Sequence, residues 1–328
     1  MGWLFGVAMA ACGGPRVPPG PPPPLAAVRL GHFPTLTHAP GLVAHALSRA
    51  GEGVFERHLG PGVAVTWQVF QAGPSAMEAI LTGALDATYV GPSPAYNAYA
   101  RTQGDEVRVL AAAVTGGSAL VVRRAAGITE PAQLRGRMVA TPQLGNTQDV
   151  ACRAFLQSLG LRVTLTGGDV RVVPIEAPSQ LAMFQAGTLD AAWAVEPWVS
   201  RLLREGGGVV LHEEPHAVTT LLVARAAFVA AYPEAVVALR AAHRELLGIC
   251  RDAAPRAREL AARELQTLTG RPVAAELVAS CWRRLSFGER IDAGTFARYL
   301  VDARAAGLLR QTPEPDRLVL PEPMEQPR

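Results

Sequence analysis

One stretch of the chain matches a metal-binding pattern. Residues 212–216 read HEEPH and fit the H-E-x-x-H motif of zinc hydrolases. That motif works on a helix, where His212 and His216 would share one face. Pro215 stands between them, after a strand-like GGGVVL, and proline disrupts a helix interior. We therefore keep a zinc hydrolase using HEEPH only as a remote alternative and predict no metal ligands.

Other catalytic patterns are missing from the sequence. It contains no G-x-S-x-G elbow, no Walker loop and no G-x-G-x-x-G. Cys152, Cys250 and Cys281 form no C-x-x-C pair, so we expect buried, hydrophobic cysteines and leave a Cys250–Cys281 disulfide open. We predict that the protein is not an enzyme, with no catalytic residues and no cofactor.

The residues suited to hold a ligand lie in loops that follow strand-like segments and open helices. A helix N-terminus carries unpaired N–H groups and about half a positive charge, so it can bind an anion without a basic side chain. In open α/β sheets, ligands collect at the carboxyl ends of the strands. The candidates are Thr37, His38, Gly73, Ser75, Gly91, Ser93, Ser118, Asn146, Thr147, Gln148, Glu196 and Trp198.

Each of these loops also has an ordinary structural interpretation. Ser75 with Glu78 fits a capping box, and Ser93 before Pro94 fits an N-cap with proline at the first helical position. Asn146 or Thr147 can cap the next helix. A cap uses one or two N–H groups, so capping and ligand binding are compatible.

Glu196 and Trp198 differ from the other candidates in chemistry. Pro197 favours extended geometry at Glu196, and Trp198 offers a large apolar face with one N–H donor. Ligand contact and a structural role are equally open for both. A carboxylate near an anion is unfavourable unless it binds a hydroxyl or amine of the ligand, or points away.

Two alternating series of strands and helices position these loops. Such alternation predicts parallel, doubly wound sheets. The first series has strands over 27–33, 63–70, 86–90 and 107–114, and helices over 39–50, 75–83 and 93–101. The second has strands over 137–142, 170–175 and 190–195, and helices over 147–160, 179–187 and 197–206.

A repeated phrase supports two similar lobes. Residues 82–94 read TGALDATYVGPSP, and 186–198 read AGTLDAAWAVEPW. Two similar apolar segments, 118–128 and 219–229, fit a pair of hinge strands, and helices follow from Pro233. We predict lobe 1 over 27–117 plus 219–312, lobe 2 over 118–218, and a Pro-rich, mostly surface or disordered tail over 313–328.

The N-terminus predicts export. Residues 1–12 contain a short apolar run that ends in Met9-Ala10-Ala11-Cys12, which fits a lipobox whose Cys12 is lipidated. Residues 13–26 form a Gly/Pro-rich tether. No Arg or Lys precedes Cys12, so the alternative is that this segment is no signal. We expect a periplasmic or extracytoplasmic, membrane-anchored lipoprotein.

Composition narrows the class of partner. The 328 residues, 49% of them hydrophobic, suffice for two cores. All 31 basic residues are arginine and the net charge is only +3, without a basic run that could follow phosphates. We therefore expect no nucleic-acid partner. We also expect the protein to be a monomer.

Five stretches together resemble the solute-binding proteins of the nitrate, sulfonate and taurine class of ABC importers. They lie at 31–40, 70–98, 134–156, 184–207 and 219–229. The resemblance implies a two-lobed periplasmic-binding-protein fold of type II that closes over a small oxyanion and delivers it to a permease in the cytoplasmic membrane. It places the ligand on the candidates named above.

Within this class the five stretches are most similar to those of aliphatic-sulfonate binders, and nitrate, bicarbonate and taurine are the other possible ligands. The loops contain no arginine, except by long reach from Arg123 or Arg124, so helix N-termini would have to hold the anion. A neighbouring branch implies the alternative of a thiamine-pyrimidine precursor or similar heterocycle, paired with Glu196 and stacked on Trp198. The pyrimidine synthases of that branch need a lysine, and this chain has none.

Overall fold

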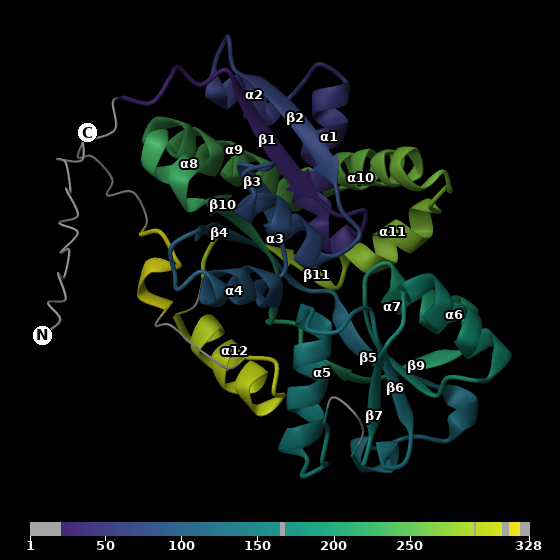
Figure 1. Ribbon diagram of the computed structural model, residues 1–328. Helices are drawn as coiled ribbons and strands as arrows, with labels where there is room; N and C mark the ends of the chain where they lie inside the picture. Colours follow the sequence, from purple (N-terminus) through teal and green to yellow (C-terminus); the bar gives the residue numbers. More distant parts are fainter. Residues whose placement is uncertain (1–20, 165–167, 292, 310–314, 322–328) are drawn as a thin grey trace, which may run out of the picture.

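The protein has two lobes, each built around one sheet (Figure 1). A computed structural model describes residues 21–164, 168–291, 293–309 and 315–321. The predicted signal segment with Cys12, and the tether up to residue 20, lie outside the described residues. Within the described part, no helix is both long and apolar enough to cross a membrane.

The first lobe contains a sheet in the order β11-β4-β10-β3-β1-β2. β1 pairs in parallel with β2 and β3, whereas β10 lies antiparallel between β3 and β4. Its strands are β1 (Ala27–His32), β2 (Ala64–Val69), β3 (Ala87–Val90), β4 (Val107–Gly116), β10 (Val218–Arg225) and β11 (Leu285–Phe287). Between these strands run α1 (Ala39–Arg49), α2 (Val54–Leu59), α3 (Gly73–Leu81) and α4 (Pro92–Arg101).

The second lobe repeats this layout with the order β7-β6-β8-β5-β9. β6 pairs in parallel with β7 and β8, and β5 runs antiparallel beside β8, as β10 does beside β3. Its strands are β5 (Ser118–Arg123), β6 (Met138–Thr141), β7 (Arg171–Pro174), β8 (Ala191–Val195) and β9 (Gly208–Glu213). Its α-helices are α5 (Thr147–Ser158), α6 (Ala177–Ala186) and α7 (Trp198–Glu205). The predicted alternation of strands and helices is confirmed in both lobes.

The chain crosses between the lobes twice, and the crossings lie side by side. β4 passes into β5 through Gly116 and Gly117, whose φ angles of 74° and 70° favour glycine. β9 passes into β10 through residues 214–217. The Gly116 N–H donates to the Ala217 carbonyl oxygen at 2.9 Å, which joins the two crossings. The predicted pair of hinge strands is therefore present as β5 and β10.

The C-terminal helices mostly pack on the first lobe. α9 contacts α1 and α2, and α10 contacts α1. Two of them also reach the second lobe, because α11 contacts α7 and α12 contacts α5 as well as α4 of the first lobe (Figure 1). The helices in this part are α8 (Ala226–Ala231), α9 (Pro233–Asp252), α10 (Ala254–Thr269), α11 (Ala275–Trp282) and α12 (Ala293–Ala305).

One part of the Pro-rich tail packs against the first sheet. Leu318 is fully buried, and the Val109 N–H donates to its carbonyl oxygen at 2.6 Å. The Leu320 N–H donates to the Val109 carbonyl oxygen at 3.0 Å. The tail thus pairs alongside β4 through a parallel bridge between Val109 and Val319, which the proline content alone did not indicate.

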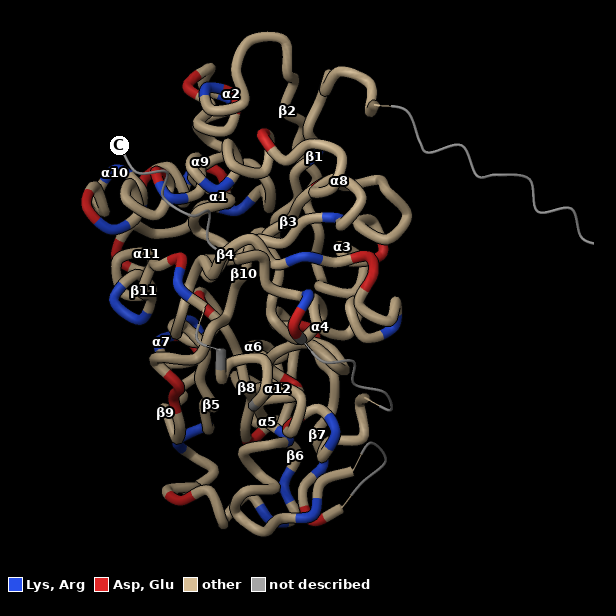
Figure 2. The backbone as a smooth tube through the Cα atoms, turned by 90° about the vertical axis from the view of Figure 1, so that its left-hand side faces the viewer, with Lys and Arg blue, Asp and Glu red and all other residues tan. Residues whose placement is uncertain are grey.

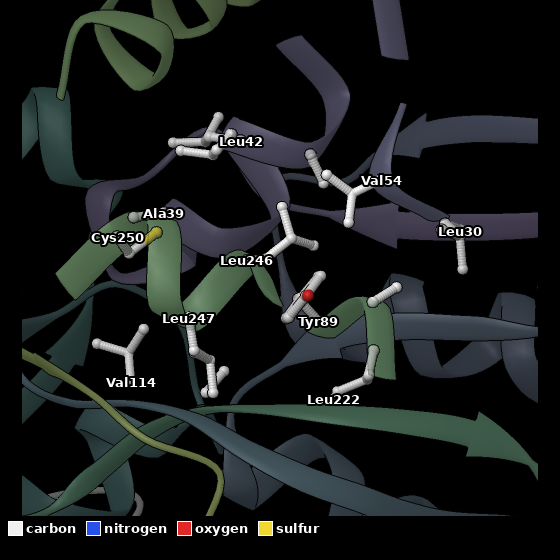
Figure 3. Packing of buried hydrophobic residues seen from close by; sticks show 14 of the residues in the cluster. Leu30, Ala39, Leu42, Val54, Tyr89, Val114, Leu222, Leu246, Leu247 and Cys250 are labelled. Carbon is white, nitrogen blue, oxygen red and sulfur yellow. The ribbon is translucent and has the colours of Figure 1, made fainter. Parts of the chain in front are cut away.

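Apolar burial joins the sequence-distant parts of the first lobe. Leu42 of α1, Tyr89 of β3, and Leu246 and Cys250 of α9 belong to one buried cluster (Figure 3). Cys152, Cys250 and Cys281 are all free and buried, so the Cys250–Cys281 disulfide does not form. Burial raises the pKa of each thiol. Arginines and acidic residues are interspersed over both lobes (Figure 2).

Candidate functional site

The repeated phrase places an aspartate at equivalent positions of the two sheets. Asp86 and Asp190 stand directly before β3 and β8, at the ends opposite to the loops in which ligands collect. Each aspartate joins arginines of neighbouring segments, in the pairs Asp86–Arg29 at 2.7 Å, Asp86–Arg225 at 3.3 Å, Asp190–Arg123 at 2.8 Å and Asp190–Arg137 at 3.0 Å. Arg123 and the adjacent Arg124 therefore lie at the far end of the second sheet, and the predicted long reach to the ligand loops is wrong.

His38 presents a buried polar atom without a partner. It is the last residue of the short 3-10 helix Leu36–His38, and its ring stacks on Phe33 with centroids 4.4 Å apart. Its Nδ1 lies 2.9 Å from the Thr35 hydroxyl oxygen, whereas its Nε2 is buried with no hydrogen-bond partner among the described residues. The pKa of His38 is lowered to about 3, mainly by burial and to a smaller extent by the nearby His32. When Thr35 donates to Nδ1, the neutral ring carries its proton on Nε2.

Backbone hydrogen bonds join this loop to the second lobe and to the hinge. The Leu36 N–H donates to the Glu196 carbonyl oxygen at 3.1 Å, and the Glu196 N–H donates to Gly117 at 2.8 Å. The Thr220 hydroxyl donates to the Thr37 carbonyl oxygen at 2.8 Å. The structure thus brings Thr37, His38 and Glu196 together beside the crossing.

The starts of α4 and α5 face each other across the lobes. α4 begins at Pro92 with Gly91 as its N-cap, so the predicted N-cap at Ser93 is wrong. The Ser93 N–H lies 3.3 Å from the Thr147 hydroxyl oxygen, and the Ser93 hydroxyl donates to the Gly145 carbonyl oxygen at 2.6 Å. Ser93 therefore connects the lobes instead of capping its helix.

Asn146 is the N-cap of α5, which confirms one of the two predicted caps, Asn146 or Thr147. Its side-chain oxygen accepts the Asp149 N–H at 2.8 Å. The fully buried Asp149 carboxylate in turn accepts from Thr141 at 2.9 Å and pairs with Arg153 at 3.0 Å. The backbone N–H groups of Thr147 and Gln148 are left free among the described residues, at a helix end that favours negative charge.

Glu196 is fully buried, and its carboxylate is already hydrogen-bonded within the protein. It accepts the Ser200 backbone N–H at 3.0 Å and the Ser200 hydroxyl at 2.9 Å. Burial raises the pKa of Glu196, and these bonds offset only part of that effect. Trp198 begins α7, half-buried against the second-lobe core, with the Arg201 guanidinium 4.9 Å from its ring centroid.

Arg284 is a residue of this junction that sequence reasoning missed. It lies in the first lobe between α11 and β11. Its guanidinium nitrogens are nevertheless 3.4 Å from the Glu196 carboxylate and 2.6 Å from the Glu213 carboxylate of the second lobe. Only folding brings these positions together, so no local pattern could have identified Arg284. With both carboxylates beside it, its charge is already compensated.

The remaining candidates have local roles in the structure. α3 begins at Gly73 without a side-chain cap, so the predicted Ser75–Glu78 capping box is wrong. Ser75 is exposed and donates to the Ala72 carbonyl oxygen at 2.8 Å. Ser118 is buried and accepts the Trp193 indole N–H at 2.9 Å. Ligand contact by these residues stays a prediction.

The HEEPH stretch does not have the geometry of a zinc hydrolase. His212 and Glu213 end strand β9, and His216 lies in the crossing that follows. His212 stacks on Phe155 with ring centroids 4.0 Å apart. Because this segment is not helical, its two histidines do not share a helix face as that motif requires.

Relatives and solved structures show similarity to periplasmic binding proteins. The taurine-binding periplasmic protein of Escherichia coli K12 is 30% identical over 145 residues, covering 44% of this chain and 43% of the relative. The chain spans about half the length, or less, of the curated relatives it matches.

Two solved structures share the fold along most of the chain. The alkanesulfonate-binding protein SsuA from Xanthomonas axonopodis pv. citri, bound to MOPS, has a TM-score of 0.70 at 19% identity, covering 90% of this chain and 96% of that one. The periplasmic aliphatic sulphonate binding protein SsuA from Escherichia coli also has a TM-score of 0.70 at 19% identity, covering 89% and 97%. The predicted two-lobed periplasmic-binding-protein fold is therefore confirmed. Since the model of the NMT1-like family matches residues 21–265, the chain belongs to that family.

Proposed function

We propose that this protein is the extracytoplasmic solute-binding component of an ABC importer, and that it encloses a small oxyanion between its lobes. An aliphatic sulfonate is the first choice of ligand. The observation that carries the proposal is the hydrogen-bonded meeting of strand-end loops from both lobes, at Leu36 with Glu196 and at Ser93 with Thr147. The sulfonate- and taurine-binding relatives support the choice of ligand.

The groups available to the ligand are neutral donors. His38 Nε2 and the N–H groups of Thr147 and Gln148 have no partner among the described residues. Arg284 is already paired with two carboxylates. A sulfonate carries one negative charge over three oxygens, so several N–H dipoles can hold it without a free cation. Such donors favour an oxyanion over a cation or an apolar solute.

In this proposal the protein binds and releases its solute unchanged and then delivers it to a permease. It acts as a monomer in the periplasmic or extracytoplasmic space, where a lipidated Cys12 holds it at the membrane. The tether over residues 13–26 would give the lobes reach from that anchor.

A thermal-shift panel tests the proposal. It should run in Tris buffer, because MOPS and HEPES are themselves sulfonates. Ethanesulfonate, butanesulfonate, taurine, nitrate and bicarbonate are compared with sodium chloride at equal ionic strength. A ligand at 100 times its Kd adds about 2.7 kcal/mol of stability, so a sulfonate should raise Tm by several degrees. A flat response across the panel would contradict the proposal, and quenching of tryptophan fluorescence by an aminopyrimidine would favour the heterocycle alternative instead.

A further inference from the structure

A second cluster of polar side chains lies in the first lobe, apart from the interlobe contacts. His32 ends β1, His45 lies on α1 and Glu264 lies on α10, and all three are buried. His32 Nε2 is 2.9 Å from His45 Nδ1, which is 3.0 Å from Glu264 Oε1. The three ligand atoms lie within 4.8 Å of one another.

One shared proton cannot satisfy this cluster well. If His45 Nδ1 carries a proton, that proton must serve both His32 Nε2 and Glu264 Oε1. If His32 Nε2 carries it instead, the lone pair of His45 Nδ1 faces the Glu264 carboxylate. If both nitrogens carry protons, the two protons collide. A cation between the three atoms would satisfy all of them at once.

We propose that His32, His45 and Glu264 bind a divalent transition-metal ion, with zinc the first choice. Two imidazoles and one carboxylate form a known zinc ligand set. Zinc–ligand bonds of about 2.1 Å in tetrahedral geometry separate the ligand atoms by about 3.4 Å. The observed 2.9 Å and 3.0 Å would widen by a few tenths of an ångström, and the third separation, which is within 4.8 Å, would settle near the same value.

The surroundings orient the ligand side chains. His32 Nδ1 lies 3.3 Å from the Phe33 carbonyl oxygen, so a proton on Nδ1 leaves Nε2 facing the cluster as an acceptor. Trp67 stacks on His45 with ring centroids 5.0 Å apart and fixes that ring.

Arg49 is the group that competes with the metal. Its Nε lies 3.1 Å from Glu264 Oε1, and its side chain is 48% exposed. It can therefore turn into solvent when a metal ion enters. We therefore expect substitution of Arg49 to raise the zinc affinity and substitution of a ligand residue to lower it.

The test is a zinc titration of the full, chelator-treated protein against a chromophoric zinc chelator. We expect one zinc ion per chain, at least tenfold weaker binding in His45→Gln and Glu264→Gln, and tighter binding in Arg49→Ala. A His212→Gln/His216→Gln double variant, which removes the HEEPH histidines, should bind zinc as the wild type does.

Circular dichroism and the melting temperature without metal report whether each variant folds. If His45→Gln fails to fold, Arg49→Ala still decides, because loss of a competing cation can only strengthen a site at Glu264. Three results would overturn the proposal. These are unchanged zinc affinity in folded His45→Gln and Glu264→Gln, loss of zinc binding in the HEEPH variant, and less than one zinc ion per wild-type chain. Sulfonate binding should persist in the ligand variants, so this result and the transport proposal can fail separately.

Discussion

Gly91 caps α4 of the first lobe, Thr147 begins α5 of the second, and the two approach so closely that a side chain at Gly91 would clash. A Cβ added there would lie 2.4 Å from the Thr147 hydroxyl oxygen, far inside van der Waals contact. We predict that Gly91→Ala keeps the lobes from closing and weakens sulfonate binding about tenfold or more, through a misfit worth at least about 1.4 kcal/mol. Titration calorimetry measures the change.

The matched control for Gly91→Ala removes the other half of the clash. Thr147→Ala deletes the hydroxyl, so the double variant should bind sulfonate more tightly than Gly91→Ala alone. If the double variant gains nothing, closure is not limited at this contact.

His38 tests whether a neutral donor holds the ligand. His38→Phe keeps an aromatic ring against Phe33 but removes the Nε2 donor, and loss of one buried hydrogen bond should weaken sulfonate binding roughly 10- to 100-fold. Because the pKa of His38 is lowered to about 3, wild-type affinity should also stay constant between pH 5 and pH 8. Affinity that rises as the pH falls below 6.5 would show a charged histidine at the site instead.

Folding stability, in contrast, should depend on pH. Burial lowers the pKa of His32 to about 4, of His38 to about 3 and of His243 to about 4. Below pH 6.5 the unfolded chain binds protons that the folded chain does not, so stability is lost as the pH falls from 6.5 towards 4. The slope is up to roughly 1.4 kcal/mol per pH unit for each histidine. Urea unfolding at several pH values should show this loss, and His38→Phe should show a smaller slope than the wild type.

Much of this arrangement could be predicted from the sequence, because local patterns specify it. The repeated phrase predicted β3 and β8 and the loops that follow them, and Asn146 was one of two expected caps. The N-cap at Ser93 was wrong because both Pro92 and Pro94 fit a first helical turn, and local rules do not choose between them. Arg284 and Glu264 could not be predicted, since their partners lie far away in the sequence and meet them only through tertiary packing.

The two aspartates of the repeat offer a matched pair for stability. The Asp86 side chain is 4% exposed and that of Asp190 is 22% exposed, although each pairs with two arginines. Removing one partner of a buried pair costs about 3 kcal/mol, whereas a more exposed pair is worth about 1 kcal/mol. Asp86→Asn should therefore lower the urea midpoint clearly more than Asp190→Asn, and equal effects would contradict the burial difference.

Arg284 should couple the two lobes energetically. The free energy of unfolding in urea is measured for Arg284→Gln, Glu196→Gln and the double variant. We expect a coupling energy of about 1 kcal/mol or more between the two residues, because Glu196 is fully buried. The exposed pair Arg244–Glu289 is the control and should show at most about 0.5 kcal/mol. Equal coupling in the two pairs would argue against a structural role for Arg284 between the lobes.

Calorimetric titration of ethanesulfonate into the wild-type protein, in a sulfonate-free buffer, tests most directly whether the two lobes enclose an oxyanion. We expect saturable binding of one sulfonate per chain, with affinity reduced in both Gly91→Ala and His38→Phe. No saturable heat with any sulfonate, or full affinity in both variants, would contradict the claim that the two lobes enclose an oxyanion at this junction.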